Sequence, residues 1–488
     1  MKVSISYPPI HSSKGIPLLS QNRQFQYFNK PTYIYPVVPA YAATLLKENG
    51  FEVLWDDGIA EEKTYEKWLK DLVSEHPDII AIETKTPVVK KHWIISKEIK
   101  EYLPDSKVVF MGDHVTALPL ESFENSKVDI VITGGDYDFS ILSIARWLEK
   151  KGDLESGIFY RKNGEIKNTG KFTSNNSLNS LPFIDRELTK WWLYAHNNGN
   201  FKMTPGAYTM VGRDCWWRNR GGCTFCSWPT LFPAYHVISP DLLVNEIGML
   251  IEKYQVKEVF DDTGTFPVGQ WLKKFCELMI ERKYYKKITF SCNLRFGVLT
   301  QNDYQMMRKA GFRMLLYGVE SANQKTIDRL NKGINVENII NECKIAKSEG
   351  LEPHITIMVG YPWETREDAL RTLNLARILM ENGWVSTLQS TVVIPYPGTK
   401  LFKESVKNGW LRVDSKDYNR FDMREPVLMT PDMEPEEVMK ICDGIYKIFL
   451  SPRYVLNHLT KVRSIKDVQY IIRGMKKIVG HRNDFSKN

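Results

Sequence analysis

The chain has 488 residues, more than one ordinary hydrophobic core accommodates, which predicts two or three domains. Hydrophobic residues make up 43% and charged residues 25%, as in globular proteins, and no apolar run of about 18 residues predicts a membrane span. The formal net charge of +8 is spread along the chain, so nucleic acid binding is not expected.

The first stretch, MKVSISYPPI, predicts a β-strand. It is too short and too polar for a signal peptide. We therefore expect a cytoplasmic protein. Short β-rich runs such as DIIAIE and KVVFMG then alternate with helical patterns to about residue 140. This alternation predicts an α/β domain with a parallel sheet, whose ligands bind beyond the carboxyl ends of the strands.

From about residue 150 the alternation of strand and helix patterns stops. GIFYRKNGEIKN predicts a hairpin that turns at Asn163-Gly164, and TSNNSLNSLP predicts a linker. Six further β-rich runs separated by helical patterns predict a partial (βα)6 barrel of TIM type. The basic, helical C-terminal region predicts a cap on the barrel or, alternatively, a basic surface for peripheral contact with a membrane. The expected divisions are 1–145, a Rossmann-like binding domain; 146–204, a linker with a hairpin; 205–400, the partial barrel; and 401–488, a helical domain.

The cysteines suggest a metal centre. Seven cysteines, an odd number, argue against a disulfide framework. Four are scattered and expected to be buried thiols: Cys276, Cys292, Cys343 and Cys442. The other three lie within GRDCWWRNRGGCTFCSW, after the first barrel strand: Cys215, Cys223 and Cys226. A zinc site would need a fourth ligand such as His236, whereas three thiolates on a 4Fe-4S cluster leave one iron free for a substrate or cofactor.

A strand, a cysteine loop and a six-unit barrel resemble the radical S-adenosylmethionine (SAM) superfamily, in particular the branch with an N-terminal cobalamin-binding domain. The family spacing is C-x3-C-x2-C, and this chain departs from it with the seven residues WWRNRGG in the first gap. FCSW, VFDDTGTF, SCNLRFG, LLYGVESANQKTIDRLNKG and IMVGYPWET resemble the later motifs. The resemblance implies that the three cysteines bind the cluster and that SAM contacts Phe225, Asp261, Asp262, Asn293, Arg295, Glu320, Val359 and Gly360.

FMGDHVTALP and VDIVITGGDYD resemble the cobalamin-binding domains of that branch. The resemblance implies cobalamin contacts at Thr84, Thr86, Gly112, Asp113, His114, Val115, Gly134 and Gly135. The glycines would let the backbone approach a corrin tail that a side chain would block. No D-x-H-x-x-G motif is present, since Pro9 stands where the Asp before His11 would be. His114 is therefore expected to be a hydrogen-bonding loop residue, and cobalt is expected to have no protein histidine ligand.

The resemblance implies an anaerobic, cobalamin-dependent C-methyltransferase that acts on an unactivated carbon through a 5′-deoxyadenosyl radical. Residues that could line its pocket are Tyr317, Tyr361, Trp363, Gln389 and Tyr396. Two alternatives stay open: radical cyclisation, rearrangement or carbon–carbon coupling of a lipid or tetrapyrrole, and a zinc-stabilised nucleic-acid-binding protein. Expected partners are a small-molecule, lipid or peptide or protein substrate and an electron donor such as ferredoxin or flavodoxin.

Overall fold

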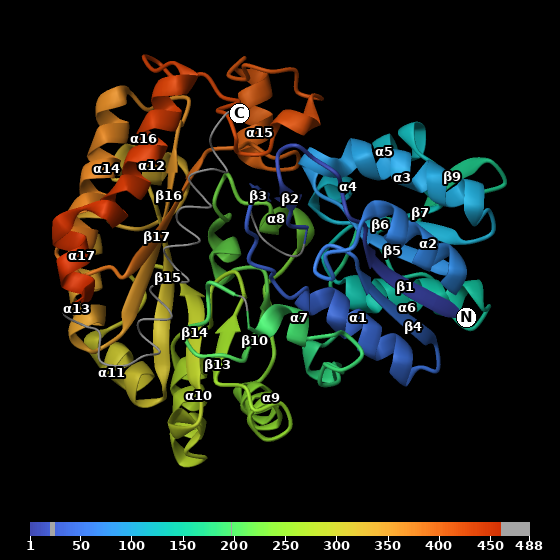
Figure 1. The fold of residues 1–488 in the computed structure, drawn as a ribbon, viewed down its shortest axis with the longest axis horizontal. Helices are drawn as coiled ribbons and strands as arrows, with labels where there is room; N and C mark the ends of the chain where they lie inside the picture. Colours follow the sequence, from blue (N-terminus) through green and yellow to red (C-terminus); the bar gives the residue numbers. More distant parts are fainter. Residues whose placement is uncertain (20–24, 197, 460–488) are drawn as a thin grey trace.

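The structure is a computed structural model that describes residues 1–19, 25–196 and 198–459. Figure 1 shows a first sheet with its helices, in blue, beside a second sheet coloured green to orange. Short elements lie between or beside these two halves: β2 (Ile16–Pro17), β3 (Tyr27–Phe28), α7 (Trp192–Ala195), β11 (Gly212–Arg213), α8 (Trp228–Leu231) and β12 (His236–Val237).

The first sheet has the strand order β4-β1-β5-β6-β7-β8-β9, and the first five of these strands are parallel. The strands are β1 (Lys2–Tyr7), β4 (Glu52–Asp57), β5 (Ile79–Glu83), β6 (Lys107–Met111), β7 (Ile130–Ile132), β8 (Ile158–Lys162) and β9 (Glu165–Asn168). The helices that follow the parallel strands or connect them are α1 (Val37–Glu48), α2 (Tyr65–Glu75), α3 (Val89–Tyr102), α4 (Asp113–Ala117), α5 (Pro119–Asn125) and α6 (Tyr137–Leu148). The predicted α/β architecture of this half is confirmed.

The predicted hairpin is present, but it belongs to the first sheet rather than to the linker. Asn163 and Gly164 both have positive φ, 54° and 82°, as a two-residue type I′ turn requires. Strand β8 pairs antiparallel with β7, so the hairpin extends the sheet at its edge. The boundary expected at residue 145 therefore falls inside this domain. Turn residues reveal a hairpin locally, whereas the strand that it pairs with is decided by long-range packing.

Buried carboxyl groups gather where the parallel strands of the first sheet end. Tyr7 Oη donates to Glu83 Oε2 at 2.7 Å, and Tyr194 Oη donates to Asp57 Oδ2 at 2.5 Å. Burial raises the pKa of Glu83 to about 7 and that of Asp57 to about 6. Both carboxyl groups hold their protons to higher pH in the folded chain than in the unfolded chain.

This raised pKa predicts a pH-dependent effect of Glu83→Gln on stability. The favourable contribution of protonated Glu83 is lost as the pH rises from about 4.5 through about 7, because the folded state then must bury a charge. The free energy of unfolding of the variant minus that of the wild type should therefore rise by up to about 3 kcal/mol when the pH is raised from 5 to 8. Urea denaturation at both pH values measures this. The exposed Glu124→Gln is the control, and an equal gain in both variants would contradict the prediction.

The second sheet has six parallel strands in the order β10-β13-β14-β15-β16-β17. The strands are β10 (Gly206–Thr209), β13 (Glu258–Asp261), β14 (Thr289–Leu294), β15 (Phe312–Glu320), β16 (Glu352–Val359) and β17 (Thr387–Val392). The helices that separate them are α9 (Pro240–Glu252), α10 (Gln270–Glu281), α11 (Gln301–Lys309), α12 (Gln324–Arg329), α13 (Ile339–Ser348) and α14 (Arg366–Glu381). The predicted partial barrel is confirmed, and Ser239 caps α9 by accepting from Leu242 N as its Ser-Pro start predicts.

The C-terminal region continues as α15 (Lys400–Lys407), α16 (Pro435–Lys447) and α17 (Pro452–Leu459). Tyr446 Oη of α16 donates to Ser390 O of β17 at 2.7 Å, so this helix packs on the last barrel strand, as a cap would. The basic stretch expected to follow lies mostly in 460–488, outside the described residues. Within the described part of the chain, no helix has the length and apolar character that crossing a membrane requires.

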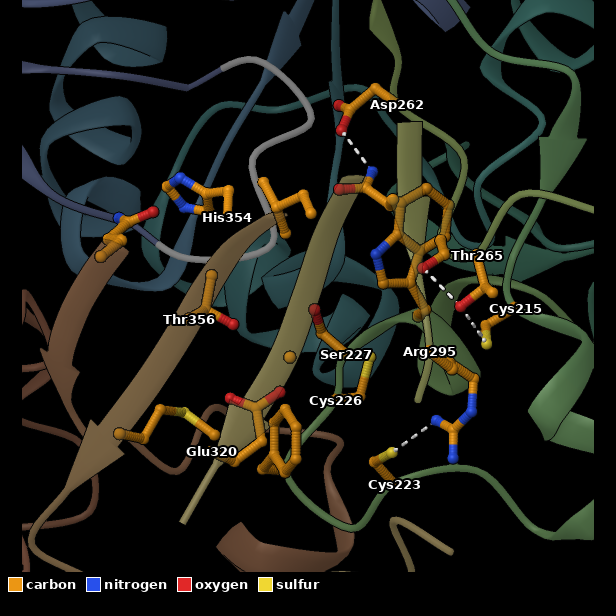
Figure 2. Close-up of a pocket in the computed structure, with 18 of the residues that line it drawn as sticks. Cys215, Cys223, Cys226, Ser227, Asp262, Thr265, Arg295, Glu320, His354 and Thr356 are labelled. Atoms are coloured by element: carbon orange, nitrogen blue, oxygen red, sulfur yellow. Dashed lines mark hydrogen bonds between the residues drawn. The ribbon is translucent and has the colours of Figure 1, made fainter. Parts of the chain in front are cut away.

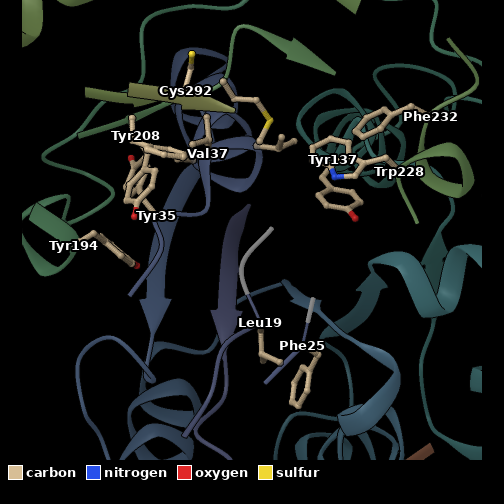
Figure 3. Packing of buried hydrophobic residues seen from close by; sticks show 14 of the residues in the cluster. Leu19, Phe25, Tyr35, Val37, Tyr137, Tyr194, Tyr208, Trp228, Phe232 and Cys292 are labelled. Atoms are coloured by element: carbon tan, nitrogen blue, oxygen red, sulfur yellow. The ribbon is translucent and has the colours of Figure 1, made fainter. Parts of the chain in front are cut away.

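Aromatic side chains and one arginine join the two halves. Figure 3 shows rings from both, among them Tyr35 and Tyr208, in one buried cluster. The Arg213 guanidinium, on β11, donates to Asp138 Oδ2 of α6 at 2.6 Å, and its Nε lies 3.6 Å from Asp136 Oδ1. All three side chains are at most 2% exposed, so the ion pair is sealed inside the joint.

Candidate active site

The three clustered cysteines line one wall of a cavity of about 390 Å³, which continues into the barrel interior. Figure 2 shows Cys215 and Cys223 near Arg295, and Cys226 near Glu320. Cys215 Sγ lies 3.0 Å from Thr265 Oγ1, which follows β13. The loop therefore brings three thiols to the carboxyl ends of the barrel strands.

The seven residues between Cys215 and Cys223 form a short 3-10 helix, Trp216–Arg220, followed by two glycines with positive φ. Trp217 Nε1 donates to Asn331 O at 2.6 Å, and the side-chain amide of Asn331 donates back to the insert. The Arg295 guanidinium lies 4.2 Å from the Trp217 ring centroid. The insert is thus a wider cysteine loop packed against the segment after α12, and it positions a cation of the site.

Gly333 leaves room for the Trp217 ring, which predicts an effect of replacing this glycine. A Cβ at Gly333 would lie 2.1 Å from the Trp217 ring, and the residue has a φ of +65°. Gly333→Ala should lower the iron content after anaerobic reconstitution and lower the unfolding temperature, because the ring must move. Gly269 is a matched control, since its φ is +68° and nothing lies within 4 Å of the Cβ position. Equal losses in Gly333→Ala and Gly269→Ala would attribute the effect to backbone strain alone.

Two cations lie beside the cysteines. Arg295 Nη1 is 3.8 Å from Cys223 Sγ, and Lys332 Nζ donates to Glu320 Oε1 at 2.6 Å. Burial raises the pKa of the Cys223 thiol, while Lys332 and Arg295 oppose that rise. Sequence reasoning missed Lys332, although it stands in the quoted RLNKG segment, because nothing local shows that this lysine turns back to Glu320.

Most of the residues expected to contact SAM line the same cavity: Phe225, Asp262, Asn293, Arg295 and Glu320. Asn293 Nδ2 lies 3.3 Å from Asp262 Oδ1, so these two form one polar group. Glu320 has a φ of +66°, an uncommon conformation for a residue with a side chain.

Three others lie elsewhere. Asp261 is fully buried and accepts hydrogen bonds from Thr209 Oγ1 at 2.9 Å and Val211 N at 3.0 Å. Among the described residues, Met358 of β16 lines the cavity, whereas Val359 and Gly360 do not. Asp261, Val359 and Gly360 do not border this space, and their expected contacts with SAM stay predictions; Asp261 and Asp262 face different surroundings although they are neighbours in sequence.

Of the other residues expected in the pocket, some line the cavity and others pack against neighbouring rings. Tyr396 lines the cavity, as does the expected Gln389. Tyr317 stacks on Phe296 with ring centroids 4.4 Å apart, and Tyr361 stacks on Trp363 at 5.4 Å. These last two tyrosines serve packing instead.

The residues expected to contact cobalamin form a separate group at the ends of the first sheet. Among the described residues, none of them lines the cavity above: Thr84, Thr86, Gly112, Asp113, His114, Val115, Gly134 and Gly135. His114 is buried, and its Nδ1 lies 3.2 Å from Thr86 Oγ1. Its ring meets Tyr418 edge to face at 4.6 Å, and the residue lies in the short helix α4 rather than in the expected loop.

The space beside the glycines of that group is filled by the chain itself. A Cβ at Gly134 would lie 2.3 Å from the Phe172 ring, and one at Gly135 would lie 2.2 Å from the Phe232 ring. The glycines therefore make room for two aromatic rings in this conformation.

The donor geometry does not support a zinc site. Among the described residues, no group of three or more His, Cys, Asp or Glu side chains is arranged to hold a single metal ion. His236, the candidate fourth ligand, lies in β12, where it pairs with Arg213. Three thiols that line one cavity without converging on one point are compatible with a larger cluster.

Residues 210–376 match the family model of the radical SAM superfamily. The chain is 25% identical over 449 residues to an uncharacterized methyltransferase of Pyrococcus horikoshii, which covers 91% of this chain and 94% of that protein. It is 23% identical over 423 residues to the anaerobic magnesium-protoporphyrin IX monomethyl ester cyclase of Cereibacter sphaeroides, covering 84% of this chain and 65% of the cyclase. Its fold is similar to that of the radical SAM methyltransferase TsrM from Kitasatospora setae, solved with cobalamin and a [4Fe-4S] cluster, with a TM-score of 0.69 and 12% identity over 99% of both chains.

Proposed function

We propose that the chain is a radical SAM enzyme and, more specifically, a cobalamin-dependent C-methyltransferase acting on an unactivated carbon. The observation that carries the proposal is the set of three cysteines on one wall of a cavity that continues into the barrel. The likeness to the Pyrococcus methyltransferase and to the fold of TsrM supports methyl transfer as the outcome.

The residues present fit a 4Fe-4S cluster and SAM. Cys215, Cys223 and Cys226 would hold the cluster, and a three-thiolate set leaves one iron for the cofactor. When bound, the cluster would supply one electron to cleave a carbon–sulfur bond of SAM. Arg295 and Lys332 place positive charge beside this anionic centre.

Polar side chains of the cavity wall would orient SAM. Asp262 and Asn293 stand at the ends of β13 and β14, where they offer carboxylate and amide groups to its ammonium and ribose. The buried Lys332 ammonium donates to Glu320 Oε1 at 2.6 Å and so directs the Glu320 carboxylate along the wall. Phe225 supplies an apolar surface next to Cys226. The chain's own part in the reaction is to hold the reactants and exclude water.

Cobalamin binding is proposed from the likeness in fold, because the first sheet presents the carboxyl ends of its strands as such domains do. Phe172 and Phe232 fill the space at Gly134 and Gly135, so binding would be accompanied by movement of these rings. An electron donor such as ferredoxin or flavodoxin and a cytoplasmic location complete the proposal.

The experiment is anaerobic reconstitution with iron, sulfide and cobalamin, followed by incubation with methyl-labelled SAM and a small-molecule extract. C-methylation predicts labelled product heavier by one CH2 unit than its precursor, together with 5′-deoxyadenosine. A colourless protein that forms no 5′-deoxyadenosine would overturn the proposal.

The second candidate is a radical cyclisation or rearrangement. The similarity to the magnesium-protoporphyrin IX monomethyl ester cyclase over 84% of this chain favours it. It predicts 5′-deoxyadenosine with an unlabelled product that has lost hydrogens or kept its mass. The position of the label therefore separates the two candidates in one experiment.

A further inference from the structure

The inner end of the cavity, away from the cysteines, is lined by one face of β16 and β17. His354 and Thr356 are two positions apart on β16, so their side chains share a face. Thr356 is paired in register with Gln389 of β17, which places that side chain on the same face. All three line the cavity, and Figure 2 shows His354 and Thr356 across it from the cysteine loop.

His354 has one nitrogen in use and one without a partner. Its Nδ1 lies 2.8 Å from Thr387 Oγ1, while its Nε2 is buried and has no hydrogen-bond partner among the described residues. Burial, with a smaller effect of Arg313, lowers the pKa of His354 to about 4. The ring is therefore neutral at pH 7, and its Nε2 offers one uncharged hydrogen-bonding position.

The neighbouring polar groups are also uncharged and unengaged. Within the described part of the chain, no hydrogen bond involves the Thr356 hydroxyl or the Gln389 amide. Arg313, the cation nearest in effect to His354, is bound to Glu258 at 2.7 Å through its Nε and to Glu352 at 2.7 Å. A neutral group that both donates and accepts hydrogen bonds would satisfy these three uncharged positions.

Around this polar set the cavity walls within the barrel are largely apolar. Lining residues of that kind are Phe260, Leu316, Met358, Leu388, Val392 and Ile394. In the β15–β16 pairing His354 lies opposite Leu316, and after a shift in register Glu320 lies opposite Ile357. His354 is therefore three residues, about 10 Å along the strand, from the level of Glu320, and Thr356 is one residue from it. Apart from Lys30, the charged lining residues belong to the cysteine loop, the ends of β13–β15 and the segment after α12.

We propose that His354, Thr356 and Gln389 bind a neutral polar head group, of carboxamide or hydroxyl type, at one end of an elongated apolar substrate. The substrate would lie along the barrel interior with its other end toward the cysteines. This inference rests on the proposed function, because it assigns a substrate class to the same cavity.

The test uses three probes of equal chain length and different head group: octanamide, octanoate and octylammonium. Calorimetry on the full chain, anaerobic and without SAM, should show octanamide binding more tightly than either charged probe. His354→Leu, Thr356→Val and Gln389→Leu should each weaken octanamide binding roughly three- to tenfold, the usual effect of one buried hydrogen bond. They should leave the affinity for octylammonium unchanged.

His92 is the matched control. It is buried, its Nδ1 lies 2.7 Å from Thr84 Oγ1, and its Nε2 has no hydrogen-bond partner among the described residues, yet it does not line the cavity. In wild-type protein with 15N-labelled histidine, octanamide should shift the Nε2 signal of His354 and not that of His92. This measurement needs no variant to fold.

Two results would overturn the inference: equal binding of the three probes, or octanamide binding that leaves the His354 signal in place. The probes bind without SAM, so failure here is separate from failure of the proposed function. Octanamide binding in a protein that never cleaves SAM would keep the pocket and reject the radical chemistry. SAM cleavage without head-group preference would keep the radical chemistry and reject the proposed head-group site.

Discussion

Replacing Cys226 with alanine is expected to reduce 5′-deoxyadenosine formation to the level of a protein-free control. The variant keeps Cys215 and Cys223, but two thiolates cannot hold a 4Fe-4S cluster in the arrangement that leaves a single open iron. Iron content and visible absorbance after anaerobic reconstitution should fall together with SAM cleavage, measured by chromatography of the nucleoside product. The same result is expected for Cys215→Ala and Cys223→Ala.

Cys276→Ala is the control for this series. Cys276 is fully buried in α10, away from the cavity, and burial raises the pKa of its thiol to about 12. Removing it deletes one thiol without touching the cysteine loop, so iron content and SAM cleavage should stay near wild type. A Cys223→Ala protein that still produced 5′-deoxyadenosine would refute the cluster assignment.

Removal of the Arg213 charge should cause a large loss of stability. Arg213→Met keeps most of the side-chain volume but leaves Asp138 and Asp136 buried without their cation. Breaking a buried ion pair from one side typically costs about 3–5 kcal/mol, because the remaining charge stays out of water. Urea denaturation followed by tryptophan fluorescence should show a lower midpoint in the variant.

An exposed ion pair supplies the comparison. Arg366 lies on the surface, 55% exposed, and pairs with Glu437. Arg366→Met should change the free energy of unfolding by at most about 1 kcal/mol, as is usual for solvent-exposed pairs. If Arg213→Met were no more destabilising than Arg366→Met, the joint between the two halves would not depend on the buried pair. A double variant Arg213→Met/Asp138→Leu should recover part of the loss if the unpaired charge is its cause.

The sequence by itself determined the order of the strands and helices and the presence of three cysteines in one loop. Periodicity of apolar residues marked the alternating strands and helices of both sheets, because each backbone conformation sets its own side-chain repeat. Asn163-Gly164 revealed the hairpin, because few residue pairs adopt positive φ at both positions. Cys215, Cys223 and Cys226 lie within twelve residues of the sequence, so their spacing alone places the three thiols in one loop.

Only the tertiary structure decided which side chains face the cavity. Asp261 and Asp262 are neighbours in sequence, yet one supports the backbone of the first barrel strand and the other lines the site. The pairs Glu320–Lys332 and Trp217–Asn331 join residues that local patterns do not connect. Strand direction, register and the packing of distant segments set these contacts, and they are consequences of burying a whole core rather than of any one motif. The seven residues of the widened cysteine loop acquired their role in the same way, by docking against a segment more than a hundred positions later.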